Sequence, residues 1–202
     1  MKTPGVYIVE KSAFPNSVVE APTAIPAFIG ITEKPVNGAD TLSGKPWKIT
    51  SMTEFQQYFG GAPAPEFRLS VVDYPEQDAS KTFYGIPSPD KSKLLRVEAP
   101  EVTFSLYYQM VMFFANGGGT CYIVSAGTYD QKSLIDKEKV VAALTALKKE
   151  QEITMVLVPE AVSVDECKDI QTQVLAHCGE MMNRFAILDV QPKAKENEVM
   201  SE

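Results

Sequence analysis

The second half of the chain alternates short apolar runs with amphipathic stretches, and this alternation limits the possible folds more than any other feature. The apolar runs are residues 120–125 (TCYIVS), 153–158 (ITMVLV) and 184–190 (RFAILDV). Such near-continuous apolar strands are typical of a parallel sheet that is covered on both faces. We therefore predict an α/β fold, in which a mostly parallel sheet contains at least these three strands and is flanked by helices.

Helical patterns fill the gaps between these strands. Asp136 is placed to cap a helix that carries apolar residues at spacings of three and four. Residues 163–166 (SVDE) form a capping-box pattern before a second helix. We predict that one apolar stripe of this second helix faces the core, and its members are Val164, Cys167, Ile170, Val174, Cys178 and Met181.

A further helix is predicted to precede the first of these strands and to end at residues 116–119 (NGGG). Its face is marked by Phe104, Tyr107, Val111 and Phe114. Because most of its remaining residues are also apolar, we expect this helix to be buried on all sides.

The first hundred residues divide into an arm, a core strand, a helix and an irregular insertion. We expect residues 24–31 (AIPAFIGI) to enter the core as a strand, and residues 51–54 (SMTE) to open a short helix that stops at Gly60. Six prolines interrupt residues 62–100, which we interpret as a small irregular or β insertion. The predicted domains are thus an arm and linker over residues 1–23 and an α/β domain over residues 24–202.

The arm carries a strand at its tip. Its residues are apolar on both faces of the predicted strand, so they need cover from a sheet. These residues, Pro4, Gly5, Val6, Tyr7, Ile8, Val9 and Glu10, are our candidate subunit-interaction site. Residues 11–23 show no helical or strand period and are interpreted as a linker. A tethered apolar strand is suited to adding to a neighbour's sheet, although pairing within its own domain is the alternative.

Composition excludes several classes of protein. The net charge of −7 argues against a general binder of nucleic acid or anionic membranes, because both require basic patches. No apolar run approaches the roughly 20 residues that a membrane span needs. The start of the sequence lacks the apolar core of a signal peptide, so we expect the chain to fold in the cytoplasm of the cell that makes it.

Four stretches, in the same order, resemble the tail-sheath family of contractile phage tails and related injection systems. They are residues 3–7 (TPGVY) with 22–30 (PTAIPAFIG), residues 55–61 (FQQYFGG), residues 113–119 (FFANGGG) with 121–124 (CYIV), and residues 184–190 (RFAILDV). Members of the family continue into a carboxy-terminal domain, and nothing after Val190 resembles that domain. The chain is therefore similar to the amino-terminal portion of a sheath subunit.

The resemblance implies a structural polymer protein. Sheath subunits polymerise helically around an inner tube, attach to a baseplate and contract to drive the tube through a target envelope, while their terminal arms exchange strands with neighbours. It implies that the partners are other sheath subunits, the inner tube protein and the baseplate. It also implies assembly into a phage-tail-like particle or virion tail, with no enzymatic activity and no cofactor.

The alternative hypothesis is a small α/β ligand-binding protein or enzyme. Glu160 and Asp189 lie near the predicted carboxyl ends of strands, where such sheets bind ligands, and could act there as acids. However, residues 117–119 (GGG) follow a helix and precede a strand, the reverse of a phosphate-binding loop, so we interpret them as a helix cap.

The histidine and the cysteines form no recognisable catalytic pattern. We expect His177 to lie at the surface or at its boundary, without a partner for general-base chemistry. The three cysteines, Cys121, Cys167 and Cys178, lack the spacing of a metal site and are expected to be small core residues. The sequence therefore predicts no catalytic, metal-binding or cofactor-binding residues.

Overall fold

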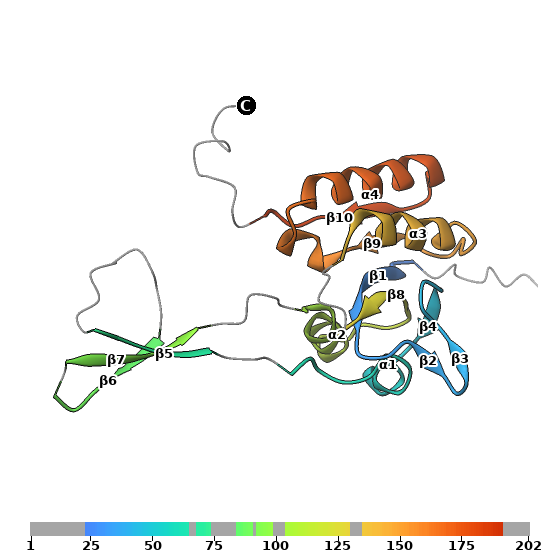
Figure 1. Cartoon of the computed structure of the whole chain (residues 1–202). Coiled ribbons are helices and arrows are strands. Elements are labelled where there is room, and N and C mark those ends of the chain that lie inside the picture. The colour runs from blue at the N-terminus through green and yellow to red at the C-terminus, as the bar shows by residue number, and fades with distance from the viewer. Residues whose placement is uncertain are drawn as a thin grey trace, which may run out of the picture.

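The computed structural model describes residues 23–64, 68–73, 84–90, 92–98, 104–129 and 135–191. Its main body is a five-stranded, mostly parallel sheet with helices on both faces, which confirms the predicted α/β fold (Figure 1). The strand order across the sheet is β10-β9-β1-β8-β4. The predicted arm strand and most of its linker lie outside the described residues.

Four parallel strands form the centre of the sheet. They are β1 (Pro26–Thr32), β8 (Cys121–Thr128), β9 (Met155–Leu157) and β10 (Phe185–Ile187). Strand β1 pairs in parallel with both β8 and β9, and β9 pairs in parallel with β10. All three strands predicted from the second half of the sequence are therefore present and parallel. The short strand β4 (Trp47–Ile49) completes the sheet by antiparallel pairing with β8.

The strand order reverses at β1, and the helices are distributed accordingly. The chain adds β8 on one side of β1 and then β9 and β10 on the other side. Helices α3 (Lys137–Leu147) and α4 (Cys167–Met181) lie on one face, whereas α1 (Met52–Phe59) and α2 (Leu106–Ala115) lie on the other (Figure 1). This doubly wound arrangement follows from the single hand of parallel crossover connections.

Strand β1 separates two hydrophobic cores. Ala27, Ile29 and Ile31 point into the core under α3 and α4. Phe28 points into the core under α1 and α2, where it meets Phe113 edge to face at a centroid distance of 5.4 Å. Every residue of β1 is buried, as expected for a central strand with cover on both faces.

The caps of α1 and α3 form as their sequences predict. The Oγ of Ser51 accepts the Glu54 N–H at 3.2 Å, and Gly60 ends α1 with φ of 89°. The Glu54 carboxylate accepts the Thr50 N–H at 2.6 Å, one residue before the expected donor. Asp136 caps α3 by accepting the Lys139 N–H at 2.8 Å.

The predicted capping box at residues 163–166 is wrong. A 3₁₀ helix, η1 (Pro159–Ser163), occupies the segment after β9, and α4 begins only at Cys167 with no side-chain cap. The Glu166 carboxylate instead accepts the Lys137 N–H at 3.1 Å and so supports the start of α3. The hydrogen bond from Lys137 on α3 thus replaces the capping interaction that was expected within α4.

The prediction that α2 is buried on all sides is also wrong. Its buried residues are Leu106 and Met110, while Tyr108, Val111 and Met112 are exposed. Of the four marked residues, Phe104, Tyr107 and Phe114 are partly buried against the two cores, whereas Val111 is not. The reason is that α2 contacts the sheet on one side only, at β1, and no described element covers its far side.

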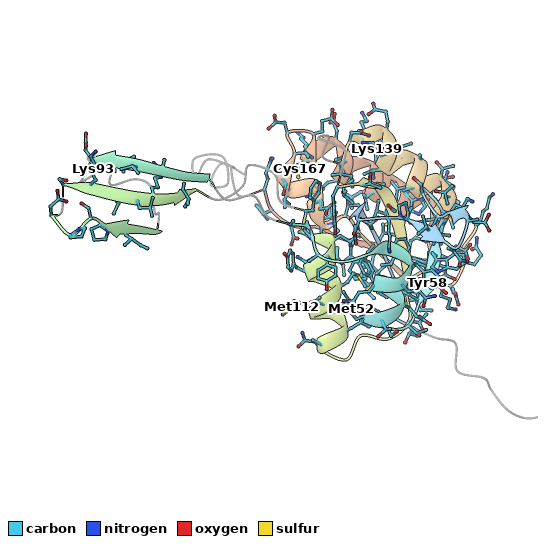
Figure 2. The ribbon with its side chains drawn as sticks, turned by 60° about the horizontal axis from the view of Figure 1, so that its bottom comes forward. Met52, Tyr58, Lys93, Met112, Lys139 and Cys167 are labelled. Carbon is cyan, nitrogen blue, oxygen red and sulfur yellow. The ribbon has the colours of Figure 1, made fainter. Side chains whose placement is uncertain are left out.

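Two small antiparallel sheets accompany the main one. Strands β2 (Val36–Asn37) and β3 (Asp40–Thr41) form a short hairpin. Strands β5 (Arg68–Asp73), β6 (Tyr84–Pro87) and β7 (Lys93–Glu98) form a three-stranded sheet in the order β5-β7-β6. This second sheet lies within the segment interpreted as an insertion and stands apart from the α/β body (Figures 1 and 2).

Gly30 allows α2 to approach β1 closely. A Cβ atom at this position would lie 2.9 Å from Leu106 Cδ2 and 3.1 Å from a Glu160 carboxylate oxygen. Leu106 is fully buried and has little freedom to move aside. We expect Gly30→Ala to lower the free energy of unfolding by about 1–3 kcal/mol, as overpacked cores do. Urea denaturation monitored by circular dichroism measures this change.

Gly179 in α4 provides the control. A Cβ atom there meets nothing within 4 Å. Alanine stabilises an exposed helix interior relative to glycine by about 0.5–1 kcal/mol, so Gly179→Ala should leave stability unchanged or raise it. Equal effects of the two substitutions would contradict the close contact between β1 and α2.

Candidate functional site

Glu160 is a buried carboxylate whose two oxygens both accept hydrogen bonds from the backbone. It follows β9 in the 3₁₀ helix η1 and is 1% exposed. One carboxylate oxygen accepts the Ile31 N–H of β1 at 2.8 Å. The other accepts the N–H groups of Ser105 and Leu106, at the start of α2, at 3.0 and 3.2 Å. One side chain therefore joins β1, α2 and η1.

The surroundings of Glu160 shift its pKa in opposite directions. Burial raises the pKa of Glu160 to about 7, while its three backbone N–H donors act to lower it. The positive end of α2 also favours a carboxylate, because this helix start has no side-chain cap of its own. Both oxygens are engaged by the backbone, so this arrangement suits a structural acceptor better than an acid that works on a ligand.

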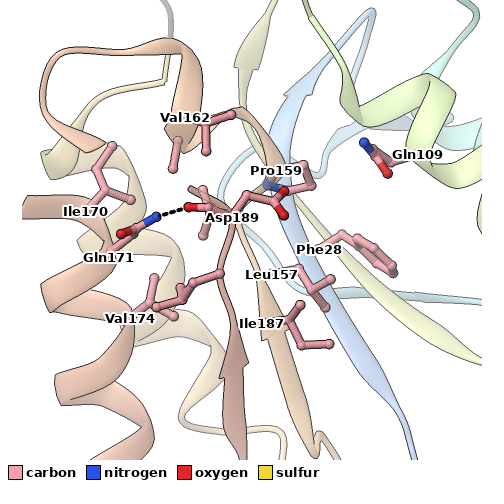
Figure 3. A pocket seen from close by; sticks show the side chains of 13 residues that line it. Phe28, Gln109, Leu157, Pro159, Val162, Ile170, Gln171, Val174, Ile187 and Asp189 are labelled. Atoms are coloured by element: carbon pink, nitrogen blue, oxygen red, sulfur yellow. Dashed lines mark hydrogen bonds between the residues drawn. The ribbon is translucent and has the colours of Figure 1, made fainter. Parts of the chain in front are cut away.

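A small pocket lies near the carboxyl ends of β9 and β10 (Figure 3). Asp189 lines it together with Phe28, Gln109, Leu157 and Ile187. Its volume of about 60 Å³ is far below the roughly 300 Å³ at which ligand pockets begin. Glu160 does not line this pocket, so the structure does not bring the two candidate acids together at one site. This pocket is therefore too small for an ordinary ligand.

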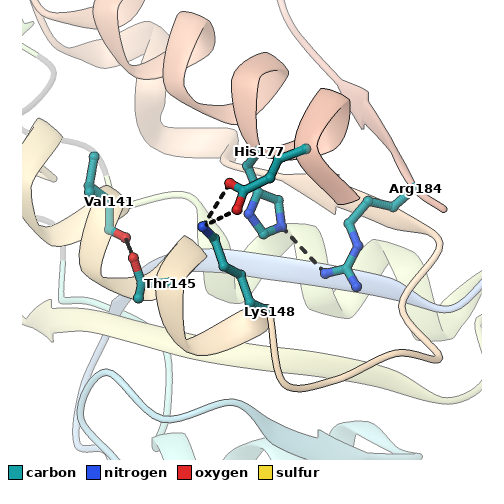
Figure 4. A network of polar contacts seen from close by, with 6 residues as sticks. Val141, Thr145, Lys148, His177 and Arg184 are labelled. Atoms are coloured by element: carbon teal, nitrogen blue, oxygen red, sulfur yellow. Dashed lines mark hydrogen bonds and ion pairs between the residues drawn. The ribbon is translucent and has the colours of Figure 1, made fainter. Parts of the chain in front are cut away.

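His177 is buried, which contradicts the predicted place at the surface. It is 4% exposed on α4, and its Nε2 lies 3.4 Å from Arg184 Nη1 (Figure 4). Its Nδ1 is buried without a hydrogen-bond partner. The spacing signal was present in the sequence, because His177 follows Val174 by three residues and so shares its buried face.

Arg184 connects the end of α3 to the start of β10. Its guanidinium donates to the carbonyl oxygens of Leu147 at 3.2 Å and Glu150 at 2.8 Å, where α3 and its following turn leave acceptors free. A cation at the carboxyl end of a helix is also favoured by the helix dipole. Nearby, Lys148 pairs with Glu180 of α4 at 2.7 Å (Figure 4). Arg184 thus links the end of α3 to β10, and the Lys148–Glu180 pair links α3 to α4.

The cysteines and the glycine run behave as the sequence predicts. Cys121, Cys167 and Cys178 are free and buried, and burial raises the pKa of Cys121 to about 12. A thiol with such a pKa is a poor nucleophile at neutral pH. Gly117 follows the end of α2 with φ of 85°, which is the left-handed conformation of a helix cap.

The edge of the main sheet at β10 is open and apolar. Ala186 packs toward the core under α3 and α4, so Phe185 and Ile187 point to the opposite face. These two side chains are 61% and 45% exposed. Among the described residues no strand pairs with the outer side of β10. An exposed apolar edge of this kind is a template for pairing with another strand.

The predicted interaction residues 4–10 lie outside the described part of the chain, so their partner is not placed. No model of a known protein family matches this sequence, and no curated protein matches it either. No described helix has the length and apolar character needed to cross a membrane.

Replacing Glu160 tests whether it joins three elements. We expect Glu160→Ala to lower the free energy of unfolding by about 3 kcal/mol or more, because it leaves three N–H groups without their acceptor. Glu180→Ala is the control, since its carboxylate is 60% exposed and its ion pair with Lys148 is screened by solvent, where such pairs add little to stability. Chemical denaturation of both variants measures the difference, and similar losses would refute a special role for Glu160.

His177 should make stability depend on pH. Burial, followed by the charges of Arg184 and Lys148, lowers the pKa of His177 below its ordinary value of 6.5. The unfolded chain therefore binds this proton more readily, so the stability that neutral His177 contributes is lost as pH falls below about 6.5. We expect His177→Gln to show a flatter fall in unfolding free energy between pH 7 and pH 5 than the unchanged chain.

The comparison between the two chains isolates His177. Glu160 has a raised pKa, so its own contribution falls as pH rises from 4.5 to about 7, and this contribution is common to both chains. Parallel pH profiles for the two chains would show that His177 does not titrate as its surroundings require.

Proposed function

We propose that this chain is part of a structural subunit of a contractile tail sheath. The observation that carries the proposal is the ordered set of motifs that resemble the sheath family, from residues 3–7 to residues 184–190. In this proposal, the subunits polymerise around an inner tube and attach to a baseplate. The complete particle is a phage tail or a related injection device, assembled in the cytoplasm of the producing cell.

The open sheet edge supports a role in strand exchange. The arm residues 4–10 are apolar on both faces and need a sheet edge, and the outer side of β10 offers one. The linker of residues 11–23 reaches up to about 43 Å when extended, which is enough to span to an adjacent subunit. We propose that these seven residues add as a strand to a neighbouring subunit.

The two candidate acids are separated in their roles, since Glu160 binds backbone N–H groups while Asp189 lines a pocket too small for an ordinary ligand. The proposed role is mechanical and structural rather than enzymatic, with no cofactor.

Charges in the arm test this proposal. Tyr7→Asp combined with Val9→Asp places carboxylates in a buried strand interface, at a cost of several kcal/mol. In the intact subunit, we expect this variant to form no sheaths by electron microscopy while its thermal unfolding stays unchanged. The polar linker supplies the matched control, because Ser12→Asp with Ser17→Asp adds the same charge outside the strand and should permit assembly.

Two results would count against the proposal. Normal sheaths from the Tyr7 and Val9 variant would show that the arm strand does not connect subunits. A markedly earlier thermal transition would instead show that the arm strand pairs within its own domain.

A further inference from the structure

The turn between α4 and β10 is attached to the end of α3 through Arg184. Its guanidinium donates to Asn183 Oδ1 at 3.0 Å, in addition to the carbonyl oxygens of Leu147 and Glu150. Nη1 contacts both the Leu147 carbonyl and Nε2 of His177 (Figure 4). Each Nη group of arginine carries two hydrogens, so both hydrogens of Nη1 are engaged. We call this set of contacts the Arg184 anchor.

The Arg184 anchor determines the tautomer of His177. A guanidinium only donates hydrogen bonds, so Nε2 of His177 must accept the one from Arg184. Neutral His177 therefore carries its hydrogen on Nδ1, which is buried and has no hydrogen-bond partner among the described residues. A second proton has to bind at Nε2, where it faces a hydrogen of Arg184 Nη1. Protonation thus removes this hydrogen bond and places two cations side by side in a buried site.

Three elements place charged groups around His177. Arg184 comes from the start of β10, Lys148 from the end of α3, and Glu180 from α4 itself. Burial is the largest cause that lowers the pKa of His177, followed by Arg184 and Lys148, while Glu180 acts in the opposite direction. Cys178 also interacts with Arg184, but burial raises the pKa of this thiol, so it stays neutral. These surroundings keep His177 uncharged at neutral pH.

Strand β10 has few other contacts that fix its position. It is three residues long, and among the described strands it pairs only with β9. Phe185 and Ile187 are exposed, whereas Ala186 packs toward the core under α3 and α4. Elements with few buried contacts are those that open locally before a whole protein unfolds. The position of β10 should therefore depend strongly on the Arg184 anchor at its start.

We propose that His177 is an acid-sensitive switch that controls the position of β10. When His177 is neutral, the Arg184 anchor is closed and β10 stays paired with β9. When His177 takes up a proton, it repels Arg184, the anchor opens, and β10 separates from β9 while the rest of the sheet stays folded. This switch belongs to the α/β body and does not rest on the proposed sheath function.

The direction of the switch follows from the sign of the shift. The pKa of folded His177 lies below 6.5, so the anchor is closed at neutral pH and opens as pH falls below about 6.5. A hydrogen bond from Lys148 lowers the pKa of Glu180, so Glu180 keeps its charge through this range. Glu160 also titrates here, but it binds β1 and α2 rather than β10. A chain without His177 separates the two titrations.

Hydrogen exchange of the full chain measures the opening of β10. The Phe185 N–H donates to the Thr154 carbonyl at 3.1 Å, and pairing with β9 protects further amides of the strand. Protection factors correct for the intrinsic effect of pH on exchange, and mass spectrometry gives them at pH 7 and pH 5. We expect the protection of β10 to fall several-fold more than that of β1 and β8 at the lower pH.

Two variants distinguish a switch from a purely structural role. His177→Gln cannot gain a charge, so its β10 should lose no more protection at pH 5 than β1 and β8 do. Glu180→Gln keeps His177 but removes an exposed carboxylate that balances the charge of Lys148. The pKa of His177 then falls further, so the pH at which β10 loses protection should shift downward. A purely structural role of His177 would give no such shift.

Three results would overturn the proposal. The first is equal loss of protection in β10, β1 and β8 of the unchanged chain, or no loss in any of them, because β10 would then not open by itself. The second is selective loss in β10 that persists in His177→Gln, because another group would then be responsible. The third is an unchanged or raised midpoint in Glu180→Gln. This last variant alters only a surface side chain, so it decides the question even if His177→Gln fails to fold.

Discussion

The bridge that Glu160 makes between β1 and α2 is the contact on which the rest of the body depends. Helix α2 begins without a side-chain cap of its own, and a carboxylate from 54 residues further along the chain supplies the acceptor. The same carboxylate holds the Ile31 N–H, where the register between β1 and β8 shifts. It thereby fixes α2 over β1 and closes the core around Phe28. Doubly wound sheets commonly bind ligands where the strand order reverses. Here the protein's own side chain binds the start of α2 close to that point.

More of the fold could be predicted from the sequence than of the contacts that stabilise it. Strands β8, β9 and β10 were evident because their apolar runs do not alternate, and Ser51, Asp136 and Gly60 were evident because caps are local signals. Glu160 was noticed as an acid, yet its donors lie on segments far away in the sequence. Glu166 fits a local capping-box pattern, but its carboxylate accepts a hydrogen bond from the start of α3, which is distant in the sequence. Such pairings depend on tertiary placement, which no spacing within a single segment reveals.

Two of the apolar surfaces that remain uncovered in the described part of the chain have different origins. At β10, α2 does not cover the sheet. Phe185 and Ile187 are therefore exposed to solvent beside an unpaired strand edge. On the small sheet, the strands themselves place Val71, Leu95 and Ile86 on one exposed face. The first surface offers backbone hydrogen bonds to a strand, whereas the second offers only side-chain packing. The two surfaces therefore differ in the contacts they offer, which are strand pairing at one and apolar packing at the other.

The central position of β1 has a consequence for synthesis on the ribosome. This strand emerges early, yet its partners β8 and β9 and the carboxylate that receives the Ile31 N–H come much later, the last of them 129 residues further on. At about 5–20 residues per second, the apolar segment waits several seconds or longer without a partner. The centre of the sheet can close only after β9 has been made, because β1 lies between β8 and β9. Until then, the apolar segment stays exposed and is prone to aggregate with other incomplete chains.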